Sequence, residues 1–586
     1  MDATVSGKSV ERELDQDRDG MLSSVIVAWT GMVLYFDPRI AALVPYAPSF
    51  FSAAAVWLFL ACLNFFWLHA VYQLCAIIWS VRVRQYGTSV RTARETLAME
   101  RSPRVAILYA TRNDFREECA DSCLSLQYSN YHLFILDDGT LPEYRDRINR
   151  WAGRDPAKVS IVRRDNCVGF KAGNLNNALR QIHAEYPYFV VADADTILPL
   201  NFIAELLPRM EEDASLAFIQ ARQEQNEEQP EQFARDLGVG IGVHYRYNVT
   251  ARAESGFLMF YGHGALMRTS TWRDVGGFPE IATEDLAYSA LARAKGWRGS
   301  YADDVICYED FPADYQRLRT RTDKWIRGTT EALFKHGPAF LRAHGVPWHE
   351  KVDLLINASS HYLSTAMLVF IVAIGAFLPA SFDHFRYTGS FFLPPVPGSK
   401  PPLELLLQTR YHIFWSWDFF LAMMVTIVVP LIPAGIALRG HPVRFMRHVV
   451  ASQFLFLATM LADARSVFAY MTTRRADFRN TNDAGTRTSR SWWPAAEFAA
   501  GLVFFALAFS SGNLWLFAPG IALVASPLIA RNGWESRSIR FASVTAAIIG
   551  FVILAFVSIQ LTRPHAAVAT LASVELRPAA RGEIAP

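Results

Sequence analysis

Long uncharged stretches and short apolar runs divide the chain into two kinds of structure. Met21–Phe36 carries no charge, and between Ile40 and Val81 His69 is the only Asp, Glu, Lys, Arg or His. Runs of this length are sufficient for helices that cross a bilayer. We therefore predict two transmembrane helices within residues 21–81, preceded by a polar cytoplasmic tail of residues 1–20.

Similar stretches return after residue 350. Glu497 is the only charge in one of them, and the others contain no Asp, Glu, Lys or Arg. The stretches are Leu354–Phe382, Phe419–Leu438, Trp492–Ala530 and Phe541–Thr562. A Ser-Ser-Gly-Asn turn at 510–513 splits the third stretch into two spans, so residues 352–562 are predicted to hold about five transmembrane helices. Residues 563–586 are then expected to form an extracytoplasmic tail.

In two amphipathic segments the apolar run is too short to cross a membrane. In Val449–Tyr470 the apolar run stops at Asp463, and residues 329–350 mix apolar side chains with Lys and His. Each is predicted to be an interfacial helix, with an ordinary surface helix as the alternative. Basic linkers, such as Arg474–Arg490, separate the spans and indicate the cytoplasmic side. The chain is therefore predicted to cross the membrane several times, with its charged middle part in the cytoplasm.

The middle of the chain, residues 95–328, has dense charge and apolar runs of strand length. Helical segments such as Lys171–Arg180 lie between these runs, and this alternation predicts an α/β domain with a mostly parallel sheet. The expected strands are Val105–Thr111, His132–Leu136, Ser160–Val162 and Tyr188–Ala192.

Acidic side chains follow two of these strands directly. Asp137 and Asp138 end the second strand, and Asp193 and Asp195 end the fourth. Ligands bind at the carboxyl ends of parallel strands, and carboxylate oxygens suit a divalent cation that also holds phosphate. Lys171 opens a helix after a glycine, which suits an anionic diphosphate. The alternatives are a solvated acidic turn and a simply capped helix.

Taken together, the order of motifs resembles that of membrane-embedded family 2 glycosyltransferases of the cellulose synthase, hyaluronan synthase and curdlan synthase group. The resemblance implies a cytoplasmic GT-A domain inserted between transmembrane helices. It rests on Thr-x-Asn-Asp at 111–114, Asp-Asp-Gly at 137–139, Lys-Ala-Gly-x-Leu-Asn at 171–176, Asp-x-Asp at 193–195, Gly-Gly-Phe at 276–278 and Thr-Glu-Asp at 283–285.

The resemblance also implies roles for individual residues. Asp285 would be the general base that takes the proton of the acceptor hydroxyl. Asp193 and Asp195 would hold Mg²⁺ or Mn²⁺, which neutralises the leaving diphosphate. The residues implied to bind the UDP-sugar are Thr111, Asp114, Asp138, Lys171, Asp193, Arg321 and Lys324, and those implied at the acceptor are Trp325, His263 and Glu284.

The chain departs from the family where Gln-x-x-Arg-Trp is usual. Arg321 replaces the glutamine and Lys324 the arginine, while Trp325 remains. A lysine offers a point charge in place of arginine's forked guanidinium. The sequence therefore leaves open how the diphosphate is bound and whether synthesis is processive. Trp325 is expected to stack on the acceptor sugar or to be a buried anchor, and His263 to touch acceptor hydroxyls or to be packed. Residues 478–481 resemble a gating loop, with a basic linker as the alternative.

The composition of the chain limits which classes of partner are expected. With 52% hydrophobic and 19% charged residues the chain mixes membrane and water-soluble parts, and its net charge of +2 gives no reason to expect nucleic acid. The expected partners are a UDP-sugar donor, a growing glycan and the lipid bilayer, with homo-oligomers or export partners left open.

The leading hypothesis is a processive inverting synthase that polymerises a UDP-sugar, first of all UDP-glucose, into a β-linked polysaccharide and exports it through its own channel. The alternatives are transfer of one sugar to a polyprenyl phosphate or other lipid, and a non-catalytic sugar-nucleotide module.

Overall fold

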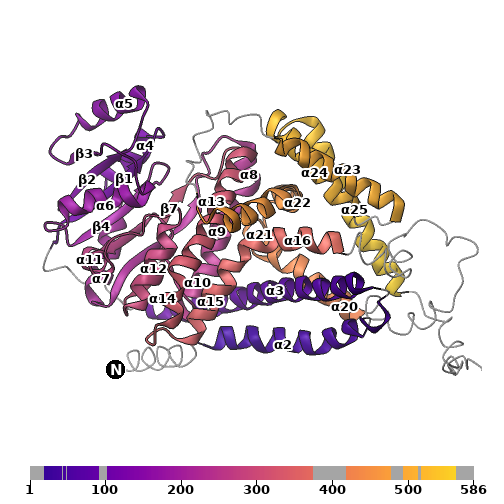
Figure 1. Cartoon of the computed structure of the whole chain (residues 1–586). Coiled ribbons are helices and arrows are strands. Elements are labelled where there is room, and N and C mark those ends of the chain that lie inside the picture. Colours follow the sequence, from indigo (N-terminus) through magenta and orange to yellow (C-terminus); the bar gives the residue numbers. More distant parts are fainter. Residues whose placement is uncertain are drawn as a thin grey trace, which may run out of the picture.

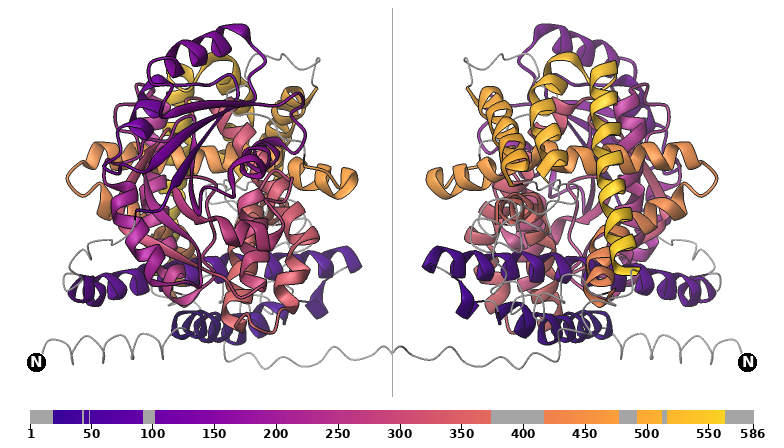
Figure 2. Two further views of the ribbon diagram at one scale, coloured as in Figure 1. Left: turned by 90° about the vertical axis from the view of Figure 1, so that its left-hand side faces the viewer. Right: turned by 90° about the vertical axis from the view of Figure 1, so that its right-hand side faces the viewer.

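The computed structural model describes residues 19–42, 44–47, 49–91, 102–373, 417–476, 492–511 and 516–562. Residues 1–18 of the predicted N-terminal tail, the predicted tail 563–586, the connection 383–411 between two expected spans and the gating-loop candidate at 478–481 lie outside the described residues. A seven-stranded sheet with covering helices lies at one end of the molecule, and α23, α24 and α25 lie at the opposite end (Figures 1 and 2).

The sheet has the order β3-β2-β1-β4-β6-β5-β7. All strand pairs are parallel except those that β6 makes with β4 and β5. The strands are β1 (Val105–Thr111), β2 (Tyr131–Asp137), β3 (Val159–Arg163), β4 (Tyr188–Asp193), β5 (Leu216–Gln225), β6 (Ala265–Arg268) and β7 (Arg298–Glu309). The mostly parallel α/β fold expected from the sequence is confirmed.

Alternate residues of the central strands pack into two cores, one on each face of the sheet. Ile107 and Tyr109 of β1 join one buried cluster, whereas Ala106 and Leu108 join the other. A strand buried on both faces has few places for polar side chains, which explains the almost entirely apolar sequence of β1. The helices in the first half of the domain are α4 (Glu117–Leu124), α5 (Pro142–Ala152), α6 (Phe170–Ile182) and α7 (Phe202–Glu212).

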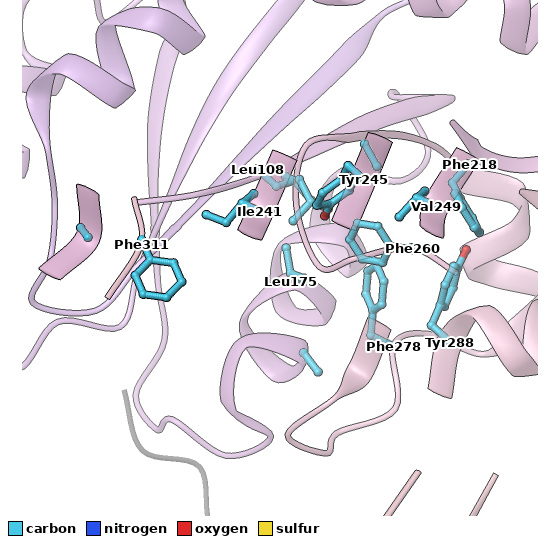
Figure 3. Packing of buried hydrophobic residues seen from close by; sticks show 14 of the residues in the cluster. Leu108, Leu175, Phe218, Ile241, Tyr245, Val249, Phe260, Phe278, Tyr288 and Phe311 are labelled. Atoms are coloured by element: carbon cyan, nitrogen blue, oxygen red, sulfur yellow. The ribbon is translucent and has the colours of Figure 1, made fainter. Parts of the chain in front are cut away.

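The second half of the domain turns towards the apolar helices. Its short elements are α8 (Gln232–Leu237), α9 (Val239–Val243), the π-helix η2 (His244–Val249), α10 (Thr250–Ser255), α11 (Thr269–Val275) and α12 (Glu284–Ala294). Phe260, Phe278 and Tyr288 pack in series, with neighbouring ring centroids 6.2 Å and then 4.7 Å apart and the rings tilted by 41° and 39° (Figure 3). These contacts fix the loop before β6 against α12.

The apolar helices lie on both sides of the domain in sequence. α2 (Gly20–Ala41) and α3 (Phe50–Arg91) precede it and pack against each other. After it come α13 (Tyr315–Lys335), α14 (Gly337–Arg342), α15 (Trp348–Ser359), α16 (Leu363–Val372), α20 (Trp417–Val428), α21 (Ile432–Ala437), α22 (Pro442–Thr473), α23 (Trp493–Ser511), α24 (Phe517–Asn532) and α25 (Arg537–Thr562).

Six helices in the described part of the chain are long and apolar enough to cross a membrane. The protein is therefore a multi-pass membrane protein. Four of the six fall in stretches expected to span, and a fifth, Trp348–Val372, starts in the expected interfacial segment and continues into one. The sixth is α22, which we expected at the interface. It is long and apolar enough to cross a membrane because its 32 residues contain further apolar turns besides the run that stops at Asp463. The expected spans in Trp492–Ala530 form the shorter helices α23 and α24.

Candidate active site

The acidic motifs converge on the carboxyl edge of the sheet. In the parallel register Thr111 at the end of β1 lies opposite Asp137 of β2, and its neighbour Ala110 lies opposite Asp193 of β4. Three adjacent strands therefore deliver the Thr111, Asp137–Asp138 and Asp193–Asp195 segments to one rim. Ligands of open α/β sheets bind at this edge.

The part of the rim expected to hold the nucleotide is pre-organised by side chains. Thr111 Oγ1 donates to Asp114 Oδ1 at 2.8 Å, and the Arg112 backbone N–H donates to the same oxygen at 2.7 Å. Asp138 is buried and is held by two hydrogen bonds from Arg164, at 2.8 Å to Oδ1 and 2.5 Å to Oδ2. The Asp138 carboxylate thus supports the loop around Arg164, and the Arg164 guanidinium is at the rim too.

Arg164 also donates to the carbonyls of Val168 and Phe170, at 2.6 and 2.8 Å. It therefore ties the acidic end of β2 to the turn that starts α6. Our sequence analysis missed this residue. The signal was present, because Arg163 and Arg164 follow the third strand just as Asp137 and Asp138 end the second.

Lys171 lies at the centre of the site. Its Nζ is 2.5 Å from Asp193 Oδ1 and 4.0 Å from Glu284 Oε1, and it donates to the Gly262 carbonyl at 2.9 Å. One ammonium therefore links the first turn of α6, the end of β4, the start of α12 and the loop before β6. The first turn of α6 contains no acidic residue, which leaves its positive end open to an anion.

Asp193 and Asp195 suit a divalent cation. Burial disfavours the Asp193 charge, but Lys171 beside it holds the pKa of that carboxyl below its usual range. Burial, with the added repulsion of Asp193, raises the pKa of Asp195 to about 7. Among the described residues the Asp195 carboxylate has no hydrogen bond or ion pair, so a cation would balance its charge.

Two carboxylates are few for a metal site made of protein alone. No group of three His, Cys, Asp or Glu suited to an ion occurs in the part of the chain that the structure covers. Mg²⁺ commonly binds through one or two carboxylates plus substrate phosphates. The donor set thus fits a cation that arrives with a diphosphate.

Glu284 and Asp285 open α12 and face the same region. Burial raises the pKa of both carboxyls, and their mutual repulsion adds to the effect for Glu284, while Lys171 opposes it. The Leu286 backbone N–H donates to Asp285 Oδ1 at 2.8 Å, which leaves Oδ2 for another partner. A raised pKa moves a carboxylate towards the range in which it accepts a proton effectively at neutral pH.

His263 is held between two groups of the rim. Its Nδ1 lies 3.0 Å from Thr196 Oγ1, and its Nε2 lies 2.8 Å from Glu309 Oε2 at the end of β7. Although burial disfavours the charged ring, Glu309 beside it raises the pKa of His263 to about 9. His263 is thus a packed, hydrogen-bonded histidine near Asp193, and Glu309 is a second residue that sequence analysis missed.

One face of α13 carries the residues that replace the family's Gln-x-x-Arg-Trp. The Arg321 guanidinium carbon lies 4.5 Å from the Phe311 ring centroid and 4.7 Å from that of Trp325. Burial lowers the pKa of Lys324, although Glu284 and Asp193 attract its charge. Trp325 is 41% exposed, with its ring 6.3 Å from that of His361. Trp325 is therefore available to a ligand and is not a buried anchor.

Another face of α13 contacts the membrane helices. Arg319 makes hydrogen bonds of 3.1 and 2.5 Å to the two oxygens of Glu497 in α23. Ser526 of α24 donates to Glu497 at 2.8 Å and lies 2.9 Å from the Tyr315 hydroxyl. The single charge of the Trp492–Ala530 stretch thus pairs with the helix that borders the rim.

Gly262 offers a test of how closely the central groups approach one another. A Cβ at this position would lie 3.5 Å from Asp285 Oδ2 and 3.7 Å from Lys171 Nζ. Gly262 has φ of 89° and Gly276 has φ of 95°, but nothing lies within 4 Å of a Cβ at Gly276. Gly262→Ala and Gly276→Ala should each destabilise the fold by about 1–2 kcal/mol. Only Gly262→Ala should lower turnover sharply, at least about tenfold when some 1.4 kcal/mol of transition-state stabilisation is lost.

Thermal unfolding and initial rates of the two variants would check this. Equal rates for the two variants would contradict a reacting group beside Gly262.

Comparisons with known proteins agree with the motifs. Residues 188–380 match the family described as "Glycosyl transferase family group 2". "Glucomannan 4-beta-mannosyltransferase 7" of Arabidopsis thaliana is 23% identical over 43% of this chain and 46% of its own length. "Glucans biosynthesis glucosyltransferase H" of Shewanella sp. (strain W3-18-1) is 26% identical over 55% of this chain and 48% of its own. The chain thus spans about half the length of these relatives.

Among solved structures, a mannosyltransferase from Pyrobaculum calidifontis in complex with GDP-Man and Mn²⁺ is 18% identical, with a TM-score of 0.36 over 63% of this chain and 98% of that one. The sequence matches, together with the sheet and its flanking apolar helices, define the class: a multi-pass membrane protein whose mostly parallel α/β domain carries a family 2 glycosyltransferase region. Residues 188–380 match this family, and the resemblance drawn from the motifs is confirmed.

Proposed function

We propose that this protein is a processive inverting glycosyltransferase that polymerises a UDP-sugar, first of all UDP-glucose, into a β-linked polysaccharide and exports it through its own membrane helices. The observation that carries the proposal is the convergence of Lys171, Asp193, Glu284 and Lys324 at one rim, beside Asp285. The Shewanella relative is a glucosyltransferase, which supports glucose as the sugar, and the Arabidopsis relative is a mannosyltransferase, which makes mannose the competing choice.

In this proposal the donor diphosphate lies against the start of α6. Thr111, Asp114 and Asp138 border the nucleotide, and Lys171, Arg321 and Lys324 offer positive charge to its phosphates. Asp193 and Asp195 would hold Mg²⁺ or Mn²⁺, which when bound neutralises charge on the leaving diphosphate. Arg321 suits this role because its guanidinium has no hydrogen bond or ion pair among the described residues and its Nε is buried without a partner.

The acceptor lies next to the donor at the same rim. Its terminal sugar stacks on the exposed Trp325, and its hydroxyl lies near Asp285, which takes the proton as the bond to the donor sugar forms. Glu284 and His263 border this hydroxyl. Attack from the face opposite the diphosphate inverts an α-linked donor to a β-linked product.

The location follows from the same proposal. Sugar nucleotides are cytosolic, so the GT-A domain faces the cytoplasm of a bacterial cell and the chain lies in the inner membrane. The domain division expected from the sequence, with spans on both sides of residues 95–328, remains part of the proposal.

The deciding experiment supplies purified protein in liposomes with radiolabelled UDP-glucose, and with GDP-mannose in a parallel arm. We expect label from UDP-glucose in a product of high mass that β-glucanase degrades. A product that extracts into organic solvent and carries one sugar would establish the lipid-acceptor alternative, which the altered Arg321–Lys324 motif favours. If only label from GDP-mannose is incorporated, the proposed donor is wrong but the proposed class of reaction stands.

Removal of divalent cations gives a further prediction. We expect EDTA to reduce polymer synthesis to background, and excess Mn²⁺ or Mg²⁺ to restore it, because only two carboxylates would hold the ion and affinity would depend on the substrate. Asp195→Asn should raise the metal concentration needed for half-maximal rate. Full activity in EDTA would contradict a metal at Asp193 and Asp195.

A further inference from the structure

A second site lies away from the catalytic rim, where the domain meets the connection between α21 and α22. A cavity of about 420 Å³ opens there, a size within the roughly 300–1,000 Å³ of ligand pockets. Its walls come from β5, α9 and η2 on one side and from residues 436–444 on the other. We call it the linker pocket. None of the residues assigned to the active site lines it.

Positive charge dominates the linker pocket. Arg246, Arg439 and Arg444 line it together with His441. Among the described residues the guanidinium groups of Arg246 and Arg439 make no hydrogen bond or ion pair, and Arg444 reaches only Glu227 at 3.8 Å.

Two carboxylates in the pocket offset part of this charge. Glu224 is 3.2 Å from Arg222, which lies outside the pocket, and Arg246 attracts its charge as well, whereas the Glu227 side chain is 80% exposed. Three arginines against two glutamates leave an excess of positive charge that suits a phosphate group.

The surroundings of the pocket are apolar and open. Ile436 in the pocket wall is 46% exposed, and on α22, next to the lining residue Arg444, Val443 is 70% and Met446 57% exposed. α21 ends a candidate membrane span, Trp417–Ala437, so the pocket lies at the depth where hydrocarbon gives way to head groups. In Figure 1, α9 and α21 lie side by side at this junction, and the two helices are in contact.

We propose that the linker pocket binds the head-group phosphate of an anionic membrane phospholipid. Arg246, Arg439 and Arg444 contact the phosphate, and the acyl chains run along Val443 and Met446. A soluble phosphate compound would use the cations but would leave the apolar rim without a function. The bound lipid would join η2 and β5 of the domain to the membrane linker. This inference does not depend on the proposed donor or product.

Binding of dioctanoyl-phosphatidylglycerol to the full-length protein in detergent tests the proposal. The variant Arg246→Gln/Arg439→Gln/Arg444→Gln should bind it at least tenfold more weakly than the wild type. The matched control, Arg531→Gln/Arg537→Gln/Arg540→Gln, removes three arginines from another linker and should change affinity less than twofold. Equal losses in both variants would overturn the site in favour of diffuse surface attraction.

Two further probes separate lipid from phosphate. Dioctanoylglycerol, which lacks the phosphate, and inorganic phosphate, which lacks the chains, should each bind far more weakly; equal binding of either would overturn the proposal. If the arginine variant fails to fold, Val443→Ser/Met446→Ser provides a second test, because loss of the apolar rim should weaken lipid binding severalfold. Unchanged lipid affinity in that rim variant would contradict the orientation proposed for the chains.

Discussion

Asp285→Asn is expected to lower kcat by about 10²–10⁴-fold, the usual contribution of a positioned general base. The amide keeps the shape and the hydrogen bond from Leu286 N, which is 2.8 Å long in the wild type, but it cannot accept the acceptor's proton. Donor binding should change little, because the proposed phosphate contacts come from Lys171, Arg321 and Lys324. Initial rates at varied donor concentration, with binding of UDP measured separately, would separate the two effects.

A matched control is available in the same domain. Glu143 lies in the first turn of α5 just as Asp285 lies in that of α12, but its side chain is exposed and makes no hydrogen bond or ion pair with another described residue. Glu143→Gln should leave both kcat and binding within about twofold, as is usual for an exposed side chain. Normal turnover by Asp285→Asn would place the base elsewhere, and Glu284 would be the first candidate.

Asp353→Ala is expected to destabilise the protein by about 3–5 kcal/mol, because it removes one partner of a buried ion pair. Arg252 Nε donates to Asp353 Oδ2 at 3.0 Å, with side-chain exposures of 3% and 0%. The Tyr72 hydroxyl and the Phe257 backbone N–H also donate to this carboxylate, at 2.7 and 2.9 Å. One carboxylate thereby joins α3, α10, α15 and the loop that carries His263.

Unfolding of the purified protein in detergent, induced by heat or by denaturant, would measure this loss of stability. Glu185→Ala removes the partner of Arg104 in an exposed pair, with exposures of 46% and 64%, and should cost about 0–1 kcal/mol. Arg252→Met/Asp353→Leu should recover part of the stability, since no charge then remains unpaired but the Tyr72 hydroxyl and the Phe257 N–H lose their acceptor. A cost for Asp353→Ala as small as that for Glu185→Ala would mean that water reaches the pair.

The first four strands were predictable because each is a short apolar run that ends in a polar motif. Val105–Thr111 was predicted with its exact bounds, and β2, β3 and β4 differ from the predictions by a residue or so at their ends. β5 and β7 were not predicted. Their second halves carry polar side chains such as Gln223 and Glu309, so neither strand is the continuous apolar run that marked the others. β6 is only four residues long, below the length at which a pattern is visible.

The candidate site was predictable where its residues follow strands or open helices. The sequence order placed Asp193, Asp285 and Lys171 in motifs, and the fold brings them to one rim. Arg164 and Glu309 were missed because their importance comes from partners far along the chain. Arg164 acts through Asp138, and Glu309 acts through His263. A single sequence gives no measure of such pairings.

The two faces of α13 also bear on how such enzymes can be recombined. One face presents Arg321, Lys324 and Trp325 to the rim. Another face carries Arg319, which forms an ion pair with Glu497 of α23. A hybrid that joined the catalytic domain of one relative to the membrane helices of another at the end of α13 would separate Arg319 from its matching acid. A joint before α13, at Asp314, keeps Arg319 with Glu497, but the rim of the exchanged domain must then match Arg321, Lys324 and Trp325 of the other relative.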